Sequence, residues 1–181
     1  MAAATASTHG TLLIVGGSGV LLRGRSRSGK SALALELISR GHRLVADDAV
    51  DLHRGADGRV HGRCPVPLHG FLAVRGLGVV NVVRMYGETA FAESAPLDLL
   101  ISLDPPAGAI IRNPLEVLSQ TSTILELELE ELFLQGHLGH NLAVLVEAAC
   151  LDRQLRAQGY RAGEDLAGRQ RRLIEAQKGA D

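Results

Sequence analysis

The chain has 181 residues, the size of a single domain, and its 46% hydrophobic and 22% charged residues exclude a disordered or fibrous protein. Its 19 basic and 20 acidic side chains leave a formal net charge of −1, so no overall positive field attracts nucleic acid or an anionic membrane. Any anion must therefore be bound locally. We expect one domain over residues 1–181, with residues 1–8 and about 178–181 disordered.

The cysteines and the N-terminus indicate a cytoplasmic protein. Cys64 and Cys150 lie far apart in dissimilar sequence surroundings, which is typical of reduced thiols. Residues 1–9 lack the basic and apolar regions of a signal peptide, and no run approaches the roughly 18 apolar residues of a membrane-spanning helix. We therefore expect no membrane insertion.

The N-terminal part predicts a strand, a loop and a helix in that order. Apolar runs at residues 11–15 and 19–22 flank a Gly-Gly-Ser-Gly segment, which predicts two strands joined by a tight turn. After a loop rich in Gly, Ser and Arg, residues 31–40 place their apolar side chains on one helical face. Gly41 follows, as expected just past a helix end.

Two carboxylates stand on the next predicted strand. Residues 44–52 form one apolar segment that contains Asp47 and Asp48, and we expect this strand beside the 19–22 strand in a parallel sheet. Asp57 and Gly58 then predict a hairpin turn before a strand at residues 59–63.

The sequence after residue 63 predicts further strands and two helices. We expect an ordered segment at residues 70–85 and a buried central strand at residues 97–103. Residues 122–129 suit a half-exposed strand or a helix, and their alternation slightly favours the strand. Amphipathic helices are expected at residues 141–156 and 164–177.

The loop at residues 24–31 fits the phosphate-binding pattern G-x-x-x-x-G-K-[ST], also called Walker A, and lies between a predicted strand and a predicted helix. In this pattern backbone N–H groups wrap a phosphate, the lysine reaches the β and γ oxygens, and the hydroxyl ligates Mg²⁺. An ordinary Gly/Ser turn is the alternative, which the strand-loop-helix context disfavours. The candidate nucleotide-binding residues are Gly24, Arg25, Ser26, Arg27, Ser28, Gly29, Lys30 and Ser31.

The two arginines of this loop have two possible roles, phosphate contact or solvated loop charge, and the second is the more frequent. Asp47 and Asp48 can divide two tasks, since neighbouring strand residues point to opposite faces. One would contact Mg²⁺, directly or through water, and the other would accept a proton from a hydroxyl nucleophile. An acidic pair at the entry of a hairpin is the alternative. The histidines form no convincing metal set.

Several sequence blocks resemble the catalytic domain of HPr kinase/phosphorylase. The resemblance is dense over residues 9–84 and returns at residues 139–144 with Glu147. Its most specific block is Arg-Gly-His-Arg-Leu-Val-Ala-Asp-Asp at residues 40–48. The other blocks are His9-Gly10, Gly19-Val20-Leu21-Leu22-Arg23-Gly24, Ser28-Gly29-Lys30-Ser31, Ala34-Leu35-Glu36-Leu37 and Arg75-Gly76-Leu77-Gly78.

The resemblance implies a P-loop NTPase fold of the phosphoenolpyruvate-carboxykinase-like α/β type, with a mixed β-sheet and flanking helices. It implies ATP-dependent phosphorylation of a serine on HPr, a small carrier of the sugar phosphotransferase system, with phosphorolysis as the reverse reaction. His9 would lie near the transferred phosphate, Asp47 would be the acid/base, and Asp48 with Ser31 would organise Mg²⁺. Lys30 keeps its phosphate-loop role. The family forms hexamers, so a homo-oligomer is a further possibility.

Four positions depart from the family pattern. The family usually has Gly at Arg27, Glu at Ala73, Asp at Asn81 and Arg at His140. These departures leave open a second hypothesis, an ATP-binding regulatory pseudo-kinase that docks to a partner without efficient transfer. A third is a small-molecule or nucleoside kinase, which the absence of an evident Arg-rich lid segment disfavours. We also expect a short form that lacks the N-terminal domain of longer family members.

Overall fold

The computed structural model describes residues 5–104, 117–134 and 141–178. Its centre is a six-stranded mixed sheet in the order β11-β12-β10-β3-β2-β4. The strands are β2 (Thr11–Val15), β3 (Ser18–Arg23), β4 (Arg43–Ala46), β10 (Leu99–Ser102), β11 (Ser119–Ile124) and β12 (Leu127–Phe133). Strands β3, β10 and β12 are mutually parallel neighbours, whereas β2 runs antiparallel to both β3 and β4. As a result, β3, β4, β10 and β12 all end at the same edge of the sheet.

A second, antiparallel sheet covers one face of the central sheet, and two helices cover the other. The second sheet has the order β1-β5-β6-β9, with β1 (Thr5–His9), β5 (Ala49–Arg54), β6 (Val60–Arg63) and β9 (Ser94–Pro96). On β2, Leu12 faces the core shared with this sheet, and Leu13 faces the core shared with α1 (Lys30–Ser39) and α3 (Leu142–Ala157). The period-2 alternation of a strand therefore builds two hydrophobic cores from one sheet.

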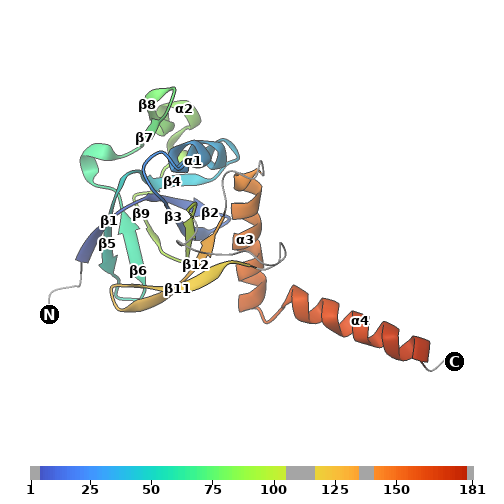
Figure 1. Ribbon diagram of the computed structural model, residues 1–181. Coiled ribbons are helices and arrows are strands. Elements are labelled where there is room, and N and C mark those ends of the chain that lie inside the picture. Colours follow the sequence, from blue (N-terminus) through green and yellow to red (C-terminus); the bar gives the residue numbers. More distant parts are fainter. Residues whose placement is uncertain (1–4, 105–116, 135–140, 179–181) are drawn as a thin grey trace.

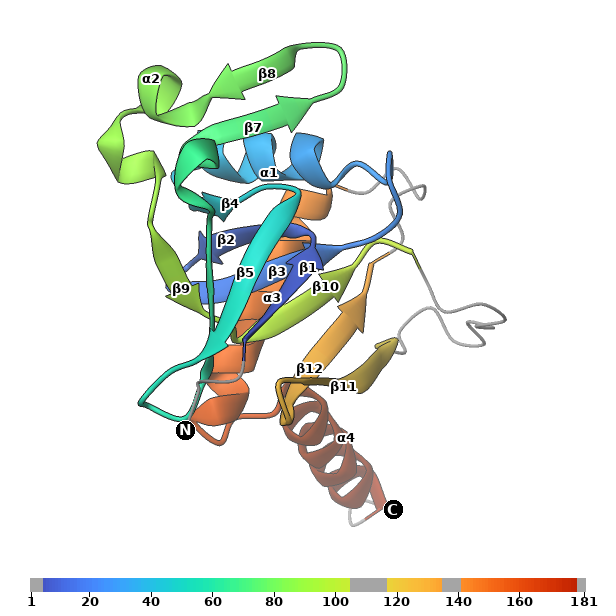
Figure 2. The same ribbon diagram turned by 90° about the vertical axis from the view of Figure 1, so that its left-hand side faces the viewer.

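A small two-stranded sheet lies over α1, as Figure 2 shows. It consists of β7 (Phe71–Val74) and β8 (Gly78–Asn81), with Leu72 and Val74 buried toward the core. Short helices flank it: η1 (Val66–Leu68), α2 (Val82–Tyr86) and η2 (Glu88–Ala90). The last helix, α4 (Ala162–Lys178), extends away from the rest of the molecule (Figure 1). In the part of the chain that the structure describes, no helix is long and apolar enough to span a membrane.

The predicted α/β class, with a mixed sheet and flanking helices, is confirmed. The disorder predicted for residues 1–8 is wrong for residues 5–8, which belong to β1 and pair with β5. The sequence of β1 is polar and exposed, so its order comes from pairing rather than from burial. Residues 1–4 and 179–181 lie outside the described residues.

The segment at 44–52 is also different from its prediction. It is two strands, β4 and β5, which belong to different sheets and meet at Asp47 and Asp48. Asp48 has φ 65°, a left-handed conformation that turns the chain from one sheet into the other. Strand β4 has the same direction as the strand before the phosphate loop, as predicted, but β2 separates the two.

The strand prediction at 122–129 is confirmed, although a turn was missed. Leu125 and Glu126, at φ 48° and 64°, join β11 to β12 in a two-residue turn. Glycine and asparagine are the usual markers of such a turn, and neither is present here.

A buried carboxylate joins three strands near the phosphate loop. Glu131 on β12 is 3% exposed, and its oxygens accept hydrogen bonds from Ser102 on β10 and from Ser122 and Gln120 on β11. Arg23, at the end of β3, lies 3.3 Å from it. Burial alone would raise the pKa of Glu131, but these hydrogen bonds and the charge of Arg23 outweigh it and leave the pKa lowered.

We therefore expect Glu131→Ala to lower the free energy of unfolding by about 3 kcal/mol, because Arg23 and two serines lose their buried partner. Urea unfolding at neutral pH measures this. Glu128→Ala, an exposed glutamate on the same strand, is the control and should change stability by less than about 0.5 kcal/mol. Equal effects of the two substitutions would contradict the stabilising role of the buried network.

Candidate active site

The phosphate-binding loop connects the end of β3 to the start of α1. Gly24 and Gly29 have φ values of 145° and 95°, which side-chain-bearing residues rarely adopt. In the described structure the N-terminus of α1 has no side-chain cap and no acidic residue in its first turn. Its first N–H groups are therefore free to bind an anion, which is the arrangement that a phosphate requires.

Arg27, at the position where the family resemblance predicts glycine, has φ 71°, a left-handed conformation. This conformation suits glycine, because it costs a non-glycine residue about 1 kcal/mol or more. Arg27 lines the candidate site, so its charge lies beside the loop.

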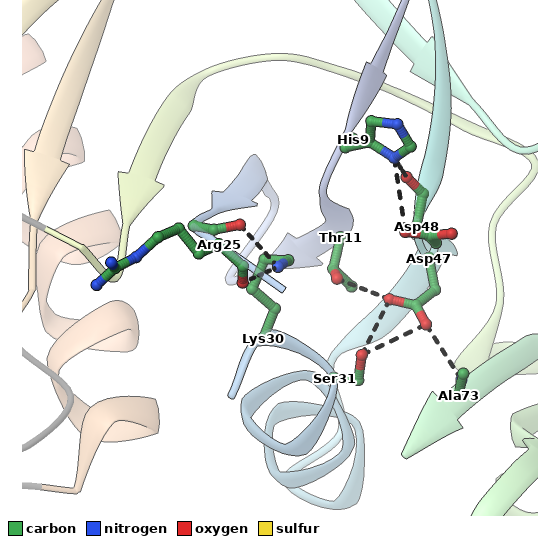
Figure 3. Close-up of polar contacts among 9 residues, drawn as sticks. His9, Thr11, Arg25, Lys30, Ser31, Asp47, Asp48 and Ala73 are labelled. Carbon is green, nitrogen blue, oxygen red and sulfur yellow. Dashed lines mark hydrogen bonds and ion pairs between the residues drawn. The ribbon is translucent and has the colours of Figure 1, made fainter. Parts of the chain in front are cut away.

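Lys30 is folded back over the loop, as Figure 3 shows. Its Nζ atom donates hydrogen bonds to the carbonyl oxygens of Gly24 and Arg25, at 2.9 and 3.0 Å. A phosphate oxygen can replace these neutral acceptors, since a charged acceptor binds an ammonium group more strongly.

Asp47 is held in place at the end of β4. It is 9% exposed, and one carboxylate oxygen accepts a 2.7 Å hydrogen bond from the hydroxyl of the buried Thr11. The other accepts the Ala73 N–H at 3.1 Å, and the Ser31 hydroxyl lies 3.4 and 3.5 Å from the two oxygens (Figure 3). Three elements therefore position this carboxylate beside the predicted Mg²⁺ ligand Ser31.

Asp48 and His9 lie together at the outer part of the site, and their side chains are 87% and 91% exposed. The Nδ1 atom of His9 is 3.2 Å from the Asp48 carbonyl oxygen and 3.6 Å from the Asp48 carboxylate. The pairing of β1 with β5, in which His9 is opposite Ala49, brings the two residues together. The predicted pair Asp48 and Ser31 has no direct contact among the described residues; Ser31 contacts Asp47 instead.

These residues surround one cavity of about 1180 Å³. Its lining includes nine of the predicted site residues: His9, Gly24, Ser26, Arg27, Gly29, Lys30, Ser31, Asp47 and Asp48. Ala32, Ala73 and Arg75 also line it. Arg75 was not predicted as a site residue, although it belongs to the Arg-Gly-Leu-Gly block, which the family resemblance had marked.

Two predicted nucleotide-binding residues, Arg25 and Ser28, do not line this cavity. The Arg25 side chain lies beside Asp104, with Nη2 3.4 Å from the carboxylate, and its backbone N–H donates to Asp104 at 2.6 Å. Ser28 N donates to the Arg25 carbonyl oxygen at 3.2 Å, so it contributes to the turn of the loop. Sequence reasoning missed Asp104, and the available signal was a carboxylate directly after the apolar 97–103 segment.

An ion-pair cluster joins the two parts of the chain that carry the family resemblance, residues 9–84 and the later segment that contains Glu147. Glu147 on α3 accepts two hydrogen bonds from Arg40, at 2.6 and 2.9 Å, and lies 2.8 Å from His42 Nε2. The hydrogen bonds from Arg40 and then from His42 lower the pKa of Glu147 to about 2. This cluster ties the end of α1 to α3 and thereby fixes the helix that carries the phosphate loop.

A Walker A loop between a strand and a helix, with a buried carboxylate facing its serine, is the arrangement of a P-loop fold. The family model described as HPr Serine kinase C-terminal domain matches residues 1–170. The chain belongs to this family. The recognition made from its sequence blocks is therefore confirmed.

Individual relatives agree with this assignment. HPr kinase/phosphorylases of Burkholderia cenocepacia and Paraburkholderia phymatum are each 47% identical over 171 residues, 94% of this chain and 52% of theirs. The chain thus spans about half the length of these curated relatives. The Hpr(Ser) kinase/phosphatase of Coxiella burnetii superimposes with a TM-score of 0.79 at 31% identity, covering 89% of this chain and 98% of that one.

The Glu147 cluster predicts acid lability with a defined pH window. Because the folded-state pKa lies near 2 and the ordinary value is 4.5, the contribution of Glu147 is complete above about pH 4.5 and is lost as pH falls toward 2. We expect the stability difference between wild type and Glu147→Gln to fall by about half between pH 5 and pH 3. Urea unfolding at both pH values measures it, and a pH-independent difference would contradict the assignment.

Proposed function

We propose that this chain is an ATP-dependent serine protein kinase that acts on an HPr-type phosphocarrier. The observation that carries the proposal is the convergence of Lys30, Ser31 and Asp47 on one cavity, with His9 and Asp48 at its outer part. The names of the relatives, HPr kinase/phosphorylase and Hpr(Ser) kinase/phosphatase, support the proposed substrate and a reverse reaction that removes the phosphate.

The loop and the start of α1 fit the triphosphate of ATP. Uncapped N–H groups at the helix N-terminus would bind phosphate oxygens, and Lys30 would exchange its two loop carbonyls for the β and γ oxygens. Ser31 would hold Mg²⁺, which supplies neutralisation of the phosphate charge when it is bound. Asp48 lines the same cavity without touching Ser31, so its share in holding the ion would be through water.

Asp47 is the proposed proton acceptor. A carboxylate has about four acceptor positions, and Thr11, Ser31 and Ala73 occupy three of them, which leaves capacity for a serine hydroxyl. In the transfer step the serine O–H proton passes to Asp47 as the bond from the serine oxygen to the γ-phosphorus forms. The bond from the γ-phosphorus to the β,γ-bridging oxygen breaks, and ADP leaves. His9 would lie beside the transferred group.

A second candidate, a nucleotide-binding regulator without efficient transfer, is favoured by Ala73. Ala73 lines the cavity at a position where the family resemblance predicts a glutamate. The Asn81 departure does not add to this argument, because Asn81 Oδ1 accepts the Arg84 N–H at 3.0 Å and caps α2, which an aspartate also does. His140 lies outside the described residues.

The decisive measurement is transfer of labelled phosphate from ATP to the organism's own HPr-type carrier and to water. We expect Lys30→Ala and Asp47→Asn each to lower the rate on the carrier by about 100-fold or more, because they remove the phosphate cation and the proton acceptor. Lys178→Ala, the other lysine, and Asp51→Asn, a nearby aspartate outside the cavity, should retain the wild-type rate.

The outcome separates the two candidates. Normal ATP binding with a wild-type rate no higher than that of Asp47→Asn would establish the regulator and exclude the kinase. A clear loss in that variant would exclude the regulator.

We further propose that the chain forms a homo-oligomer and works in the cytoplasm. Helix α4 projects from the rest of the molecule (Figure 1). Its residues Leu166, Leu173 and Ile174 are 58%, 64% and 52% exposed, and their spacing places them on one helical side. A second copy of the chain would cover this apolar side. The two buried cysteines, Cys64 and Cys150, are unpaired among the described residues, as suits a reducing compartment such as the cytoplasm.

Light scattering after size-exclusion chromatography tests the oligomer. We expect wild type to exceed the monomer mass of 19.2 kDa, and Leu166→Glu with Leu173→Glu to shift it toward the monomer. Glu175→Lys, on the opposite side of α4, is the control and should leave the mass unchanged. A monomeric wild type at about 50 μM would rule out this role of α4.

A further inference from the structure

Asp104 stands at the same edge of the central sheet as the phosphate loop. It follows β10, the parallel neighbour of β3, and the Leu103 N–H donates to the Arg23 carbonyl oxygen at 3.0 Å. The two chain segments therefore run side by side up to the point where the loop begins. The Asp104 carboxylate, at the end of the β10 segment, contacts the first residues of the loop.

The contact between them depends on Gly24. A Cβ atom at Gly24 would lie only 3.2 Å from the Asp104 carboxylate and 2.7 Å from the Ser28 hydroxyl oxygen. Gly24 also has φ 145°, which other residues rarely adopt. The first glycine of the loop therefore allows both the turn and the close approach of Asp104.

One peptide group is held from both sides. The Gly24 carbonyl and the Arg25 N–H belong to the same planar, trans peptide unit and point in opposite directions. The Arg25 N–H donates to Asp104 at 2.6 Å, and the Gly24 carbonyl oxygen accepts from Lys30 Nζ at 2.9 Å. Asp104 thus fixes the orientation of this unit, and with it the first turn of the loop and the position from which Lys30 starts in the nucleotide-free site.

We propose that Asp104 is a positioning residue, which orients the Gly24–Arg25 peptide so that the phosphate loop and Lys30 are preorganised for a nucleoside triphosphate. The inference rests on the proposed ATP-dependent function of this site. Arg25 does not line the cavity, so a bound phosphate does not compete for its N–H group. Asp104 therefore keeps this contact in the empty and the loaded site.

The charge state of Asp104 agrees with this role. The hydrogen bond from the Arg25 N–H, opposed by slight burial and helped by the guanidinium of Arg25 and by Lys30, lowers the pKa of Asp104. An ionised carboxylate makes the stronger hydrogen bond to a backbone N–H group. The bond to the Arg25 guanidinium is longer, at 3.4 Å, so the backbone bond is the principal one.

The test is titration of the full chain with a fluorescent ATP analogue in Mg²⁺. Asp104→Ala should raise Kd about tenfold, because the peptide loses its charge-assisted partner. Asp104→Asn keeps an oxygen acceptor and should stay within about threefold of wild type, as should Arg25→Ala, which keeps the backbone N–H. Asp98→Ala is the matched control, since Asp98 accepts the Gly19 N–H at 2.9 Å at the opposite end of β3 and should leave Kd unchanged.

Amide hydrogen exchange of the nucleotide-free protein supplies a second readout. The Arg25 amide should exchange faster in Asp104→Ala than in wild type or Asp98→Ala. Should Asp104→Ala fail to fold, Asp104→Glu, which displaces the carboxylate by one methylene, should show the same increase in Kd and in exchange.

Three results would overturn the proposal: a folded Asp104→Ala protein with wild-type Kd, an Arg25→Ala variant that loses as much affinity as Asp104→Ala, or a wild type that binds no nucleotide. Failure of the proposed kinase function looks different. In that case wild type binds the analogue and the Asp104 series keeps its order, but no label reaches the carrier.

Discussion

The site depends on the shared direction of β3, β4 and β10 in the central sheet. Their carboxyl ends lie at one edge, and the chain leaves that edge as the phosphate loop after β3, as Asp47 after β4 and as Asp104 after β10. The antiparallel strand β2 makes this possible, because it pairs with both β3 and β4 and so gives them one direction. Removing that constraint would separate the phosphate loop from its carboxylate.

Two ionic clusters support the elements on either side of the phosphate loop, β3 before it and α1 after it. Glu131 joins β12, β10 and β11 to Arg23 just before the loop, and Glu147 ties Arg40 at the end of α1 to α3. Neither glutamate lines the cavity. Their effect on the loop is indirect. Glu131 acts through β3, which leads into the loop, and Glu147 acts through α1, which follows it.

The residues that depart from the family pattern change the candidate site to different extents. Asn81 caps α2 as an aspartate would, and Arg27 adopts a left-handed conformation that glycine adopts at less cost. Ala73 is the substantive change, since its N–H still binds Asp47 but its side chain brings no carboxylate to the cavity. The departures therefore bear on the proposed transfer step more than on the proposed binding of phosphate.

The sequence by itself determined the phosphate loop, the acidic pair and most elements, because these depend on residues close together in the chain. Gly24 to Ser31 carry their own turn, helix start and lysine, and amphipathic periodicity marked α3. What only the tertiary structure decided was the break between β4 and β5, the order β3-β2-β4, and the partners of Asp47, Glu147 and Asp104. Each of these depends on pairing between distant segments, where one short polar residue in a left-handed turn, such as Asp48, redirects a whole strand.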